Sequence, residues 1–358
     1  MRGWFRKSQR GALAAPDTVF AMNGKVISEA AESGSEGPIT RRDGLKLVAA
    51  GVAAALLPYP SRTQTLGKPI QFSHPERKRE SMSSYIKVGQ ENSTPIEVYY
   101  EDHGSGSPVV LIHGWPLDGA SWEKQTAALL AAGHRVITYD RRGFGKSSKP
   151  AAGYNYDTFA ADLDAVLNTL KLTDVSLVGF SMGTGEVTRY IGKYGAKRVR
   201  KAVLIGTLGP YLVKAADNPE GVDRSVFEGL KAALKADRPA TLMEFLKNFY
   251  NYDVTGGKLV SERVLEANWN VATGASAIGT VACVDAWIED FRQDIARNTV
   301  PTLILHGDAD RILPADAASR RQAKMIKNVK FVELKGGPHG VLWTHAEQVN
   351  TELVKFLA

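Results

Sequence analysis

The sequence of 358 residues contains a single cysteine, Cys283, so no intrachain disulfide can form. A lone thiol also excludes the zinc and iron–sulfur sites that need several thiolate ligands. No His-Glu-x-x-His pattern is present, and the seven histidines show no other clear metal-ligand spacing. The sequence therefore gives no support to metal-based chemistry.

The sequence also has little that could span a membrane. The apolar run from Leu45 to Leu57 would extend about 20 Å as a helix. The hydrocarbon core of a bilayer is about 30 Å thick. We therefore expect no stable membrane anchor.

Most of the chain lacks an excess of either charge. The formal net charge is +7, but residues 1–81 hold 13 Lys and Arg against 7 Asp and Glu, whereas residues 82–358 hold 32 against 31. Because the basicity is confined to the N-terminal part, a nucleic-acid partner is not expected. With 44% hydrophobic and 23% charged residues, the composition is that of a globular protein, which excludes global disorder.

Residues 1–81 are expected to form a disordered N-terminal extension, because the first part is rich in Gly, Ser, Glu and Ala without a sustained apolar period. In the segment at about 40–58, Arg41 and Arg42 precede a weakly hydrophobic run, and this segment resembles a bacterial twin-arginine export signal. Gly44 departs from that pattern, since such signals usually carry a bulky apolar residue there. The resemblance implies a periplasmic or secreted protein, with a cytoplasmic protein as the alternative.

In residues 82–358, short β-rich apolar runs alternate with helical segments. Several runs consist almost entirely of Val, Ile and Leu, as in parallel strands that are buried on both faces. Between them, the segment Tyr156 to Leu172 places Phe159, Leu163 and Leu167 on one helical face. This alternation predicts an α/β fold with a parallel sheet and helices on both sides. The runs begin at Tyr85, Ile96, Pro108, Arg135, Val175, Arg200, Pro301 and Lys330.

The alternation stops between Thr207 and Pro301, where more than ninety residues contain no convincing strand. Within this interval, Val226 to Tyr250 is typical of two helices with a break at Pro239. Open α/β sheets bind ligands at the carboxyl ends of their strands. We therefore expect a helical lid over about 208–285 that shapes a substrate pocket.

The strongest chemical signal is Gly-Phe-Ser-Met-Gly at residues 179–183. It directly follows an apolar strand and directly precedes a plausible helix, which is the context of a nucleophile elbow. Gly179 and Gly183 permit a sharp turn that exposes the Ser181 hydroxyl, and the helix N-terminus directs backbone N–H groups toward it. The pattern predicts Ser181 as a nucleophile. An incidental glycine-rich turn is the alternative.

A serine hydroxyl needs a base and a carboxylate, which should follow it in the order acid, then His. Asp308 and Asp310 come just after one buried run, and His339 comes just after the next. His113 and His306 each end a run in a His-Gly pair, where loop hydrogen bonding explains them. Of the other histidines, one is expected in the final helix and three at the surface: His345, His74, His103 and His134.

Attack on an ester carbonyl creates an oxyanion that fixed backbone N–H groups can stabilise. The residue after the nucleophile, Met182, is expected to provide one donor. The loop "HGWPLDGASW" provides the other, which by position is the N–H of Trp115. The next residue, Pro116, has no N–H and can only shape the loop.

Five segments, taken in order, resemble the α/β-hydrolase fold superfamily: "YYEDHGSGSPVVLIHGWPLDGASWE", "VITYDRRGFGKSSKP", "LVGFSMGTGEVTRY", "LILHGDADRILP" and "GGPHG". The resemblance covers Tyr85 to Ala358. The combination of "HGWP" with "GFSMG" is similar to the cofactor-free haloperoxidase group, which includes non-haem chloroperoxidases, arylesterases and perhydrolases. Thr184 departs slightly, because many members carry a third glycine there.

The resemblance implies an eight-stranded, mostly parallel sheet and a Ser181–Asp310–His339 triad that forms an acyl-enzyme on small carboxylic esters. It implies no haem, metal or other cofactor. It assigns the second acid of its motif as catalytic, so that Asp308 would bond the local backbone. Hydrogen peroxide could then replace water and yield a peracid that oxidises halide in solution. Pro116 is associated in this group with the perhydrolase tendency.

Several alternatives stay open at this point. Dehalogenases and epoxide hydrolases on this fold use an Asp nucleophile, so Ser181 excludes both. A lactonase or a carbon–carbon bond hydrolase would use the same triad, because the lid sets the substrate. A non-catalytic binding protein on the same scaffold could also keep the triad. The sequence leaves a homo-oligomer open as well.

Overall fold

The computed structural model describes residues 84–358. The disordered extension expected over residues 1–81 and the twin-arginine segment at about 40–58 lie outside the described residues, so both stay predictions. Within the described part, no helix is long and apolar enough to cross a membrane.

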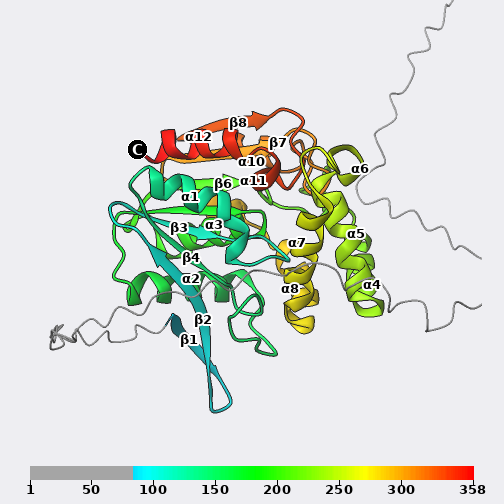
Figure 1. Cartoon of the computed structure of the whole chain (residues 1–358), viewed down its shortest axis with the longest axis horizontal. Helices are drawn as coiled ribbons and strands as arrows, with labels where there is room; N and C mark the ends of the chain where they lie inside the picture. Colours follow the sequence, from blue (N-terminus) through cyan, green and yellow to red (C-terminus); the bar gives the residue numbers. More distant parts are fainter. Residues whose placement is uncertain (1–83) are drawn as a thin grey trace, which may run out of the picture. The chain divides into compact units, whose positions relative to one another are not determined.

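An eight-stranded sheet forms the centre of the described part, with the strand order β1-β2-β4-β3-β5-β6-β7-β8. β1 and β2 pair in antiparallel fashion, β2 also pairs antiparallel with β4, and all other pairs are parallel. Every predicted run forms a strand, so the predicted fold class is confirmed (Figure 1). The strands are β1 (Tyr85–Glu91), β2 (Thr94–His103), β3 (Pro108–Ile112), β4 (Arg135–Tyr139), β5 (Val175–Phe180), β6 (Val199–Ile205), β7 (Thr302–Gly307) and β8 (Val329–Leu334).

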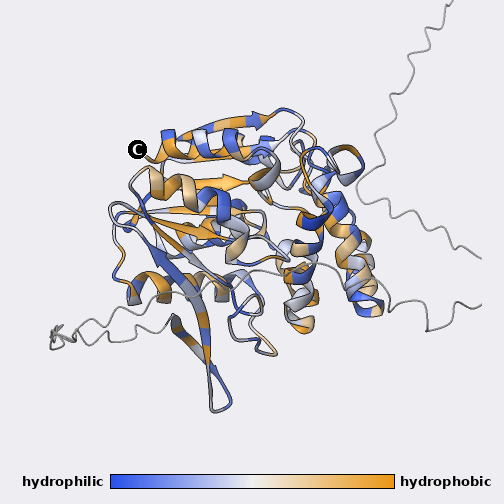
Figure 2. Ribbon diagram, viewed as in Figure 1, coloured by the Kyte–Doolittle hydropathy of each residue, from blue (hydrophilic) through white to orange (hydrophobic). Residues whose placement is uncertain are grey.

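The central strands are buried because helices cover both faces of the sheet. Every residue of β5 and of β7 is buried, which matches their nearly continuous apolar sequences. Figure 2 shows the hydrophobic colouring of the inner strands against the mixed colouring of the surrounding helices. Because β5, β7 and β8 are parallel, their carboxyl ends lie at the same edge of the sheet. The loops that follow them can carry functional side chains there.

Two helix pairs pack on opposite faces of the sheet (Figure 1). One pair is α1 (Glu123–Ala131) with α12 (Ala346–Leu357), and the other is α2 (Tyr156–Thr169) with α3 (Met182–Tyr194). The predicted apolar face of α2 is buried at Phe159, Leu163, Val166 and Leu167. Three short elements complete this part: η1 (Gly119–Trp122), α10 (Ser319–Met325) and α11 (Val341–Thr344).

The long interval between β6 and β7 is helical, as the sequence predicts. Asp237 ends the first predicted helix and caps the second, where its side chain accepts a hydrogen bond from the N–H of Ala240 at 3.0 Å. Pro239 lies in the first turn of that second helix, where its missing N–H leaves no acceptor unsatisfied. Figure 1 shows most of these helices gathered beside one end of the sheet. They are α4 (Arg224–Ala236), α5 (Arg238–Tyr250), α6 (Tyr252–Thr255), α7 (Glu262–Gly274), α8 (Ala277–Trp287) and α9 (Arg292–Ala296).

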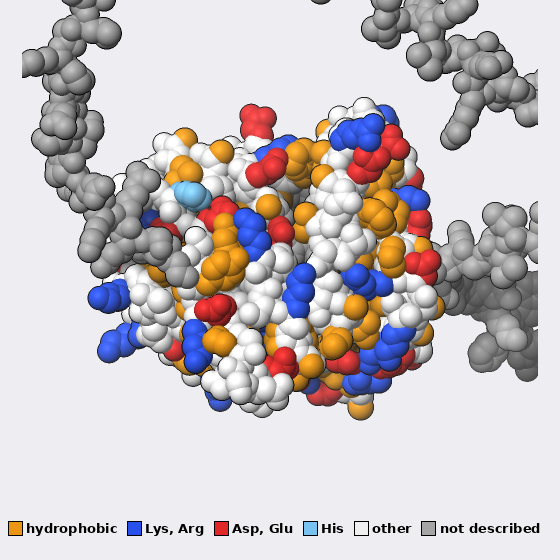
Figure 3. Space-filling view, turned by 60° about the horizontal axis from the view of Figure 1, so that its bottom comes forward, with side chains coloured by type: hydrophobic (Ala, Val, Ile, Leu, Met, Phe, Trp, Pro, Cys, Tyr) orange, Lys and Arg blue, Asp and Glu red, His pale blue; other side chains and the backbone are white. Residues whose placement is uncertain are grey.

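One face of the described part carries charges of both signs. On the face shown in Figure 3, Lys and Arg side chains alternate with Asp and Glu, and no patch of a single sign dominates. This pattern matches the near-neutral charge of residues 82–358 in the sequence.

Candidate active site

Ser181 lies in a sharp turn between β5 and α3, with a backbone φ of 52° and ψ of −119°. A side chain on Gly179 would place its Cβ 2.5 Å from the carbonyl oxygen of Gly183. A Cβ on Gly183 would in turn lie 2.2 Å from the carbonyl oxygen of Ile112. Both positions therefore require glycine, and the sequence forms a nucleophile elbow as predicted. The hydroxyl of Thr184, where many members of the group have glycine, donates to the carbonyl oxygen of Ser181 at 2.6 Å.

Three predicted side chains meet above this elbow. Nε2 of His339 lies 2.8 Å from Oγ of Ser181, and Nδ1 of the same ring lies 2.6 Å from Oδ2 of Asp310. The residues follow β5, β7 and β8, so the parallel strands bring them together from distant parts of the sequence. All three are buried, with Ser181 7%, Asp310 5% and His339 0% exposed. This geometry can pass a proton from the hydroxyl to the imidazole while the carboxylate orients the ring.

The other candidate acid, Asp308, is exposed and does not reach the histidine. Its Oδ1 accepts a hydrogen bond from the N–H of Gly336 at 2.6 Å. Asp310 instead directs Oδ2 toward His339, while its Oδ1 accepts from the N–H groups of Ile312 and Leu313, both at 2.8 Å. The structure thus places Asp308 in the loop-bonding position and Asp310 beside the histidine.

The Asp310 carboxyl is fully enclosed, and its pKa is the result of opposing effects. Burial alone would raise the pKa, but the charge of His339 and the hydrogen bonds from His306 and His339 outweigh it, so the pKa lies below its ordinary value. The group is therefore an anion at neutral pH. It can stabilise the imidazolium that forms when His339 accepts a proton.

His306 is a neighbour of this acid that the sequence analysis explained only by loop bonding. That bond is present, since its Nε2 lies 2.7 Å from the carbonyl oxygen of Leu313. The same nitrogen also lies 3.2 Å from Oδ2 of Asp310, a contact that was not predicted from the sequence. The sequence feature that could have indicated this contact is the position of His306 near the end of β7, four residues before Asp310. Another expectation was wrong, because His134, expected at the surface, is only 7% exposed.

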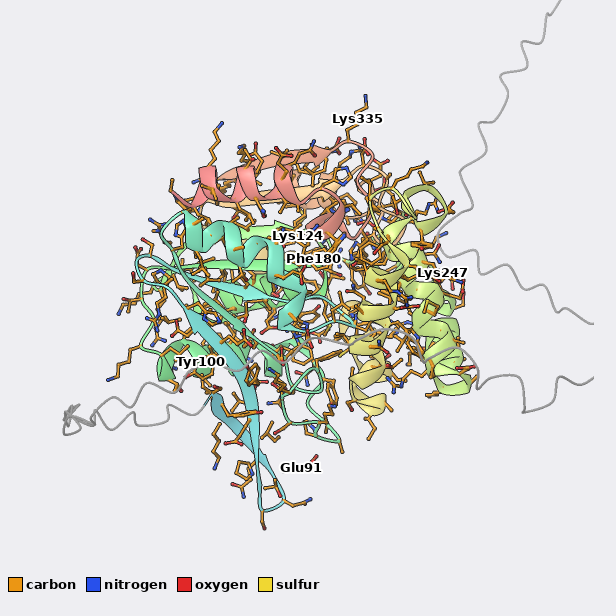
Figure 4. All side chains as sticks on the ribbon, viewed as in Figure 1. Glu91, Tyr100, Lys124, Phe180, Lys247 and Lys335 are labelled. Carbon is orange, nitrogen blue, oxygen red and sulfur yellow. The ribbon has the colours of Figure 1, made fainter. Side chains whose placement is uncertain are left out.

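Aromatic rings enclose the histidine. The ring centroids of Phe180 and Phe249 lie 5.2 Å and 5.1 Å from that of His339, and Phe180 lies in the interior of the molecule (Figure 4). Both rings also line a cavity of about 320 Å³ that extends between the loop after β3, the helices α5 and α7, and α11. Its apolar lining includes Leu117, Val264 and Leu342. Such a volume suits a small, largely apolar molecule.

The loop that was predicted to supply an oxyanion donor lies against the elbow. A Cβ on Gly114 would be 2.9 Å from Cβ of Ser181, so the backbone of this loop borders the nucleophile directly. The ring of the next residue, Trp115, packs edge-on against Phe245 and Trp287, with centroids 4.7 Å and 4.9 Å away. Within residues 84–358, no acceptor pairs with the N–H of Trp115 or with that of Met182.

A metal ion finds no obvious site in the described part of the chain. No group of three or more His, Cys, Asp or Glu side chains is arranged to hold one there. Cys283 is buried, and burial raises the pKa of its thiol to about 12, so it stays a neutral thiol.

Comparisons with known proteins agree with this architecture. Residues 107–346 match a family described as alpha/beta hydrolase fold. The non-heme chloroperoxidase CPO-A1 of Kitasatospora aureofaciens is 40% identical over 265 residues, which cover 73% of this chain and 96% of that protein. The bifunctional esterase/perhydrolase DCH of Acinetobacter calcoaceticus is 34% identical over 266 residues, with coverage of 73% and 96%. The crystal structure of bromoperoxidase from Bacillus anthracis is 50% identical, with a TM-score of 0.73 and coverage of 76% and 98%.

The match to the family extends over two thirds of the chain, and the relatives are covered almost in full. The matched residues include the elbow and all three side chains that meet above it. The protein is therefore an enzyme of the alpha/beta hydrolase fold family, similar within it to non-heme haloperoxidases and to an esterase/perhydrolase.

Proposed function

We propose that this protein hydrolyses small carboxylic esters through an acyl-enzyme on Ser181. The observation that carries the proposal is the single imidazole of His339, whose two nitrogens lie 2.8 Å from the Ser181 hydroxyl and 2.6 Å from the Asp310 carboxylate. A hydroxyl, a base and a buried acid in this order form a proton relay for acyl transfer.

The reaction has two steps. His339 removes the proton of Ser181 as the oxygen attacks the ester carbonyl, and the imidazolium then protonates the departing alcohol. In the second step His339 takes a proton from water, and the resulting oxygen nucleophile attacks the acyl-serine. The bond to Ser181 then breaks, His339 returns the proton to the Ser181 oxygen, and the carboxylic acid leaves. In both steps the N–H groups of Trp115 and Met182 stabilise the oxyanion, and no cofactor is required.

We further propose that hydrogen peroxide can replace water in the second step. Peroxide then attacks the acyl-serine, the Ser181 hydroxyl is regenerated, and the product is a peracid. The peracid oxidises a halide ion in solution and is itself reduced to the carboxylic acid, which makes halogenation a consequence of perhydrolysis. Support comes from the relatives named as chloroperoxidase and as esterase/perhydrolase.

The inserted helices are proposed to form the lid that selects the substrate. The cavity of about 320 Å³ is bounded by α5 and α7 of this insertion and is lined by the rings of Phe180 and Phe249. Its size favours short or aromatic esters over long acyl chains. A panel of esters and lactones, each with and without peroxide, separates an esterase from a lactonase and from a non-catalytic protein, which would turn over none of them.

Halogenation is expected to depend on a carboxylate buffer. In acetate with hydrogen peroxide and bromide, bromination of monochlorodimedone should proceed, because acetate is converted to peracetate through the acyl-enzyme. In a phosphate buffer at the same pH the rate should fall at least tenfold, because no acyl donor is present. An equal rate in both buffers would contradict a peracid route and would indicate direct halide oxidation.

We also propose that the segment at about 40–58 directs export through the twin-arginine route. A fusion of residues 22–65 to a reporter enzyme is expected to reach the periplasm, because paired arginines before a weakly hydrophobic run form the recognised address. Replacing both Arg41 and Arg42 by lysine should abolish export while leaving charge and hydrophobicity intact. Undiminished export of the lysine variant would refute this route and would favour the cytoplasmic alternative.

A further inference from the structure

Two hydrogen bonds to its carbonyl oxygen fix the orientation of the peptide group between Gly114 and Trp115. The carbonyl oxygen of Gly114 accepts hydrogen bonds from Nδ1 of His113 at 2.9 Å and from the N–H of Leu117 at 3.1 Å. In a trans peptide, the N–H points away from the C=O of the same group. These two bonds therefore fix the direction of the Trp115 N–H, one of the two proposed oxyanion donors.

The His113 ring is itself locked in one protonation state. Because Nδ1 donates to a carbonyl, it carries a proton, and Nε2 accepts from the N–H of Arg141 at 2.9 Å. Burial, together with the positive charge of Arg141, lowers the pKa of His113 well below its ordinary value. The ring is thus a neutral donor to Gly114 over the whole working range of pH.

Arg141 continues the chain of contacts into the core. Its Nη2 donates to the carbonyl oxygen of His113 at 3.0 Å, and its Nε donates to Oε2 of Glu186 at 2.8 Å. The other oxygen of Glu186 accepts a hydrogen bond from the hydroxyl of Tyr139. Arg141 is 1% exposed and Glu186 is 0% exposed, so both charges are removed from water.

Glu186 belongs to α3, the helix that begins at Met182 and so carries the second proposed donor. The chain Tyr139–Glu186–Arg141–His113 thus joins the elbow helix to the loop of Trp115 through side-chain hydrogen bonds and two backbone groups, the N–H of Arg141 and the carbonyl oxygen of His113. A buried ion pair seldom adds more stability than apolar residues of the same volume. Its value here is geometric, because it fixes the separation and direction of two groups that come from different elements.

We propose that Tyr139, Glu186, Arg141 and His113 are positioning residues that align the two oxyanion donors. The proposal rests on the proposed function, because it assigns these residues a role in stabilising the tetrahedral oxyanion. None of the four lines the cavity, and among the described residues none is hydrogen-bonded to Ser181, Asp310 or His339. They act through the Gly114–Trp115 peptide and through α3, which Glu186 anchors at its fifth residue.

The test compares Glu186→Gln with the wild type in p-nitrophenyl acetate hydrolysis and in inhibition by phenylboronic acid. Boronic acids form a tetrahedral adduct on a reactive serine, and one adduct oxygen occupies the oxyanion hole. We expect kcat to fall about tenfold to a hundredfold, a part of the loss seen when a whole donor is removed. KM should stay within threefold, the affinity for the boronic acid should fall at least tenfold, and the pH profile of kcat should not move.

Asp162→Asn is the matched control. Asp162 is also a buried carboxylate, and it pairs with Arg142 through two hydrogen bonds of 2.6 Å. This variant removes an equivalent buried charge but leaves the chain to His113 intact. It should lower the unfolding midpoint as Glu186→Gln does, while kcat and boronic acid affinity stay within threefold. Equal catalytic losses in the two variants, or wild-type boronic acid affinity in Glu186→Gln, would overturn the proposal.

Tyr139→Phe tests the positioning role if Glu186→Gln does not fold. This variant removes one hydroxyl and keeps the Arg141–Glu186 pair. Its boronic acid affinity should fall threefold to tenfold, and an unchanged affinity would overturn the proposal. A wild type that neither hydrolyses esters nor binds the boronic acid would refute the proposed function itself. An active wild type with an unaffected variant would refute only the positioning role.

Discussion

Replacing Ser181 by alanine is expected to lower the rate of p-nitrophenyl acetate hydrolysis by about 10³-fold or more. The reason is that the variant lacks the oxygen that attacks the carbonyl, while His339 and Asp310 can only act through that oxygen. Alanine, like serine, carries a Cβ, so the backbone at φ 52° in the turn is no more strained than in the wild type. The fold should not change, and the measurement is the steady-state rate together with the burst of p-nitrophenol.

Ser176 provides a matched control for this substitution. It lies in the same strand, β5, and is fully buried, and its hydroxyl has no hydrogen-bond partner within the described residues. Ser176→Ala should therefore keep hydrolysis within about twofold of the wild type, because it removes an equal group without touching the relay. Turnover by Ser181→Ala at the rate of this control would show that another group is the nucleophile. Peracid formation and halogenation should be lost together with ester hydrolysis.

Replacing Asp310 by asparagine is expected to lower kcat by about 10³- to 10⁴-fold, the size of effect that loss of a triad acid produces. An amide can hold the imidazole in the wrong tautomer, and it cannot stabilise the imidazolium by charge. Asp308→Asn should stay within about tenfold of the wild type, because Asp308 bonds only the N–H of Gly336 in the loop. The ratio of the two kcat values is the measurement, and a larger loss in Asp308→Asn would contradict the assignment of the acid.

The same variant carries a prediction for stability. The pKa of Asp310 is lower in the folded protein than its unfolded value of about 3.9. Its ionisation therefore contributes stability that is fully present above the unfolded pKa and is lost as the pH falls through the folded pKa. The difference in unfolding free energy between wild type and Asp310→Asn should shrink as the pH drops below about 4. Urea unfolding at neutral and acid pH measures this difference, and a constant value would argue against an ionised Asp310 in the fold.

The sheet and the elbow could be predicted from the sequence because both depend on local patterns. Strands such as β5 are nearly continuous apolar runs, which are typical of strands buried on both faces of a sheet. The turn at Ser181 needs glycine on both sides, since any Cβ at Gly179 or Gly183 would collide with backbone atoms. Strand–helix alternation then predicts a parallel sheet, and the motifs, in their order along the chain, resemble those of the family.

Other parts of the site could not be predicted in this way. Local patterns do not distinguish Asp308 from Asp310, which are two residues apart, and Asp310 was predicted only from the resemblance to the family. The choice depends on which carboxylate faces His339, and that is set by how the loops after β7 and β8 pack against each other. The spacing of residues within one loop does not indicate which of its side chains will face another loop.

The sequence by itself determined which segments form the sheet, where the nucleophile lies and to which family the chain belongs. These features depend on the order of residues within short segments, through local packing and turn geometry. Only the tertiary structure decided that His306 contacts Asp310 and that Glu186 reaches Arg141 and Tyr139. Glu186 and Arg141 are 45 positions apart and on different elements. Contacts of this kind exist only after the sheet has formed, because parallel strands bring distant residues to the same edge.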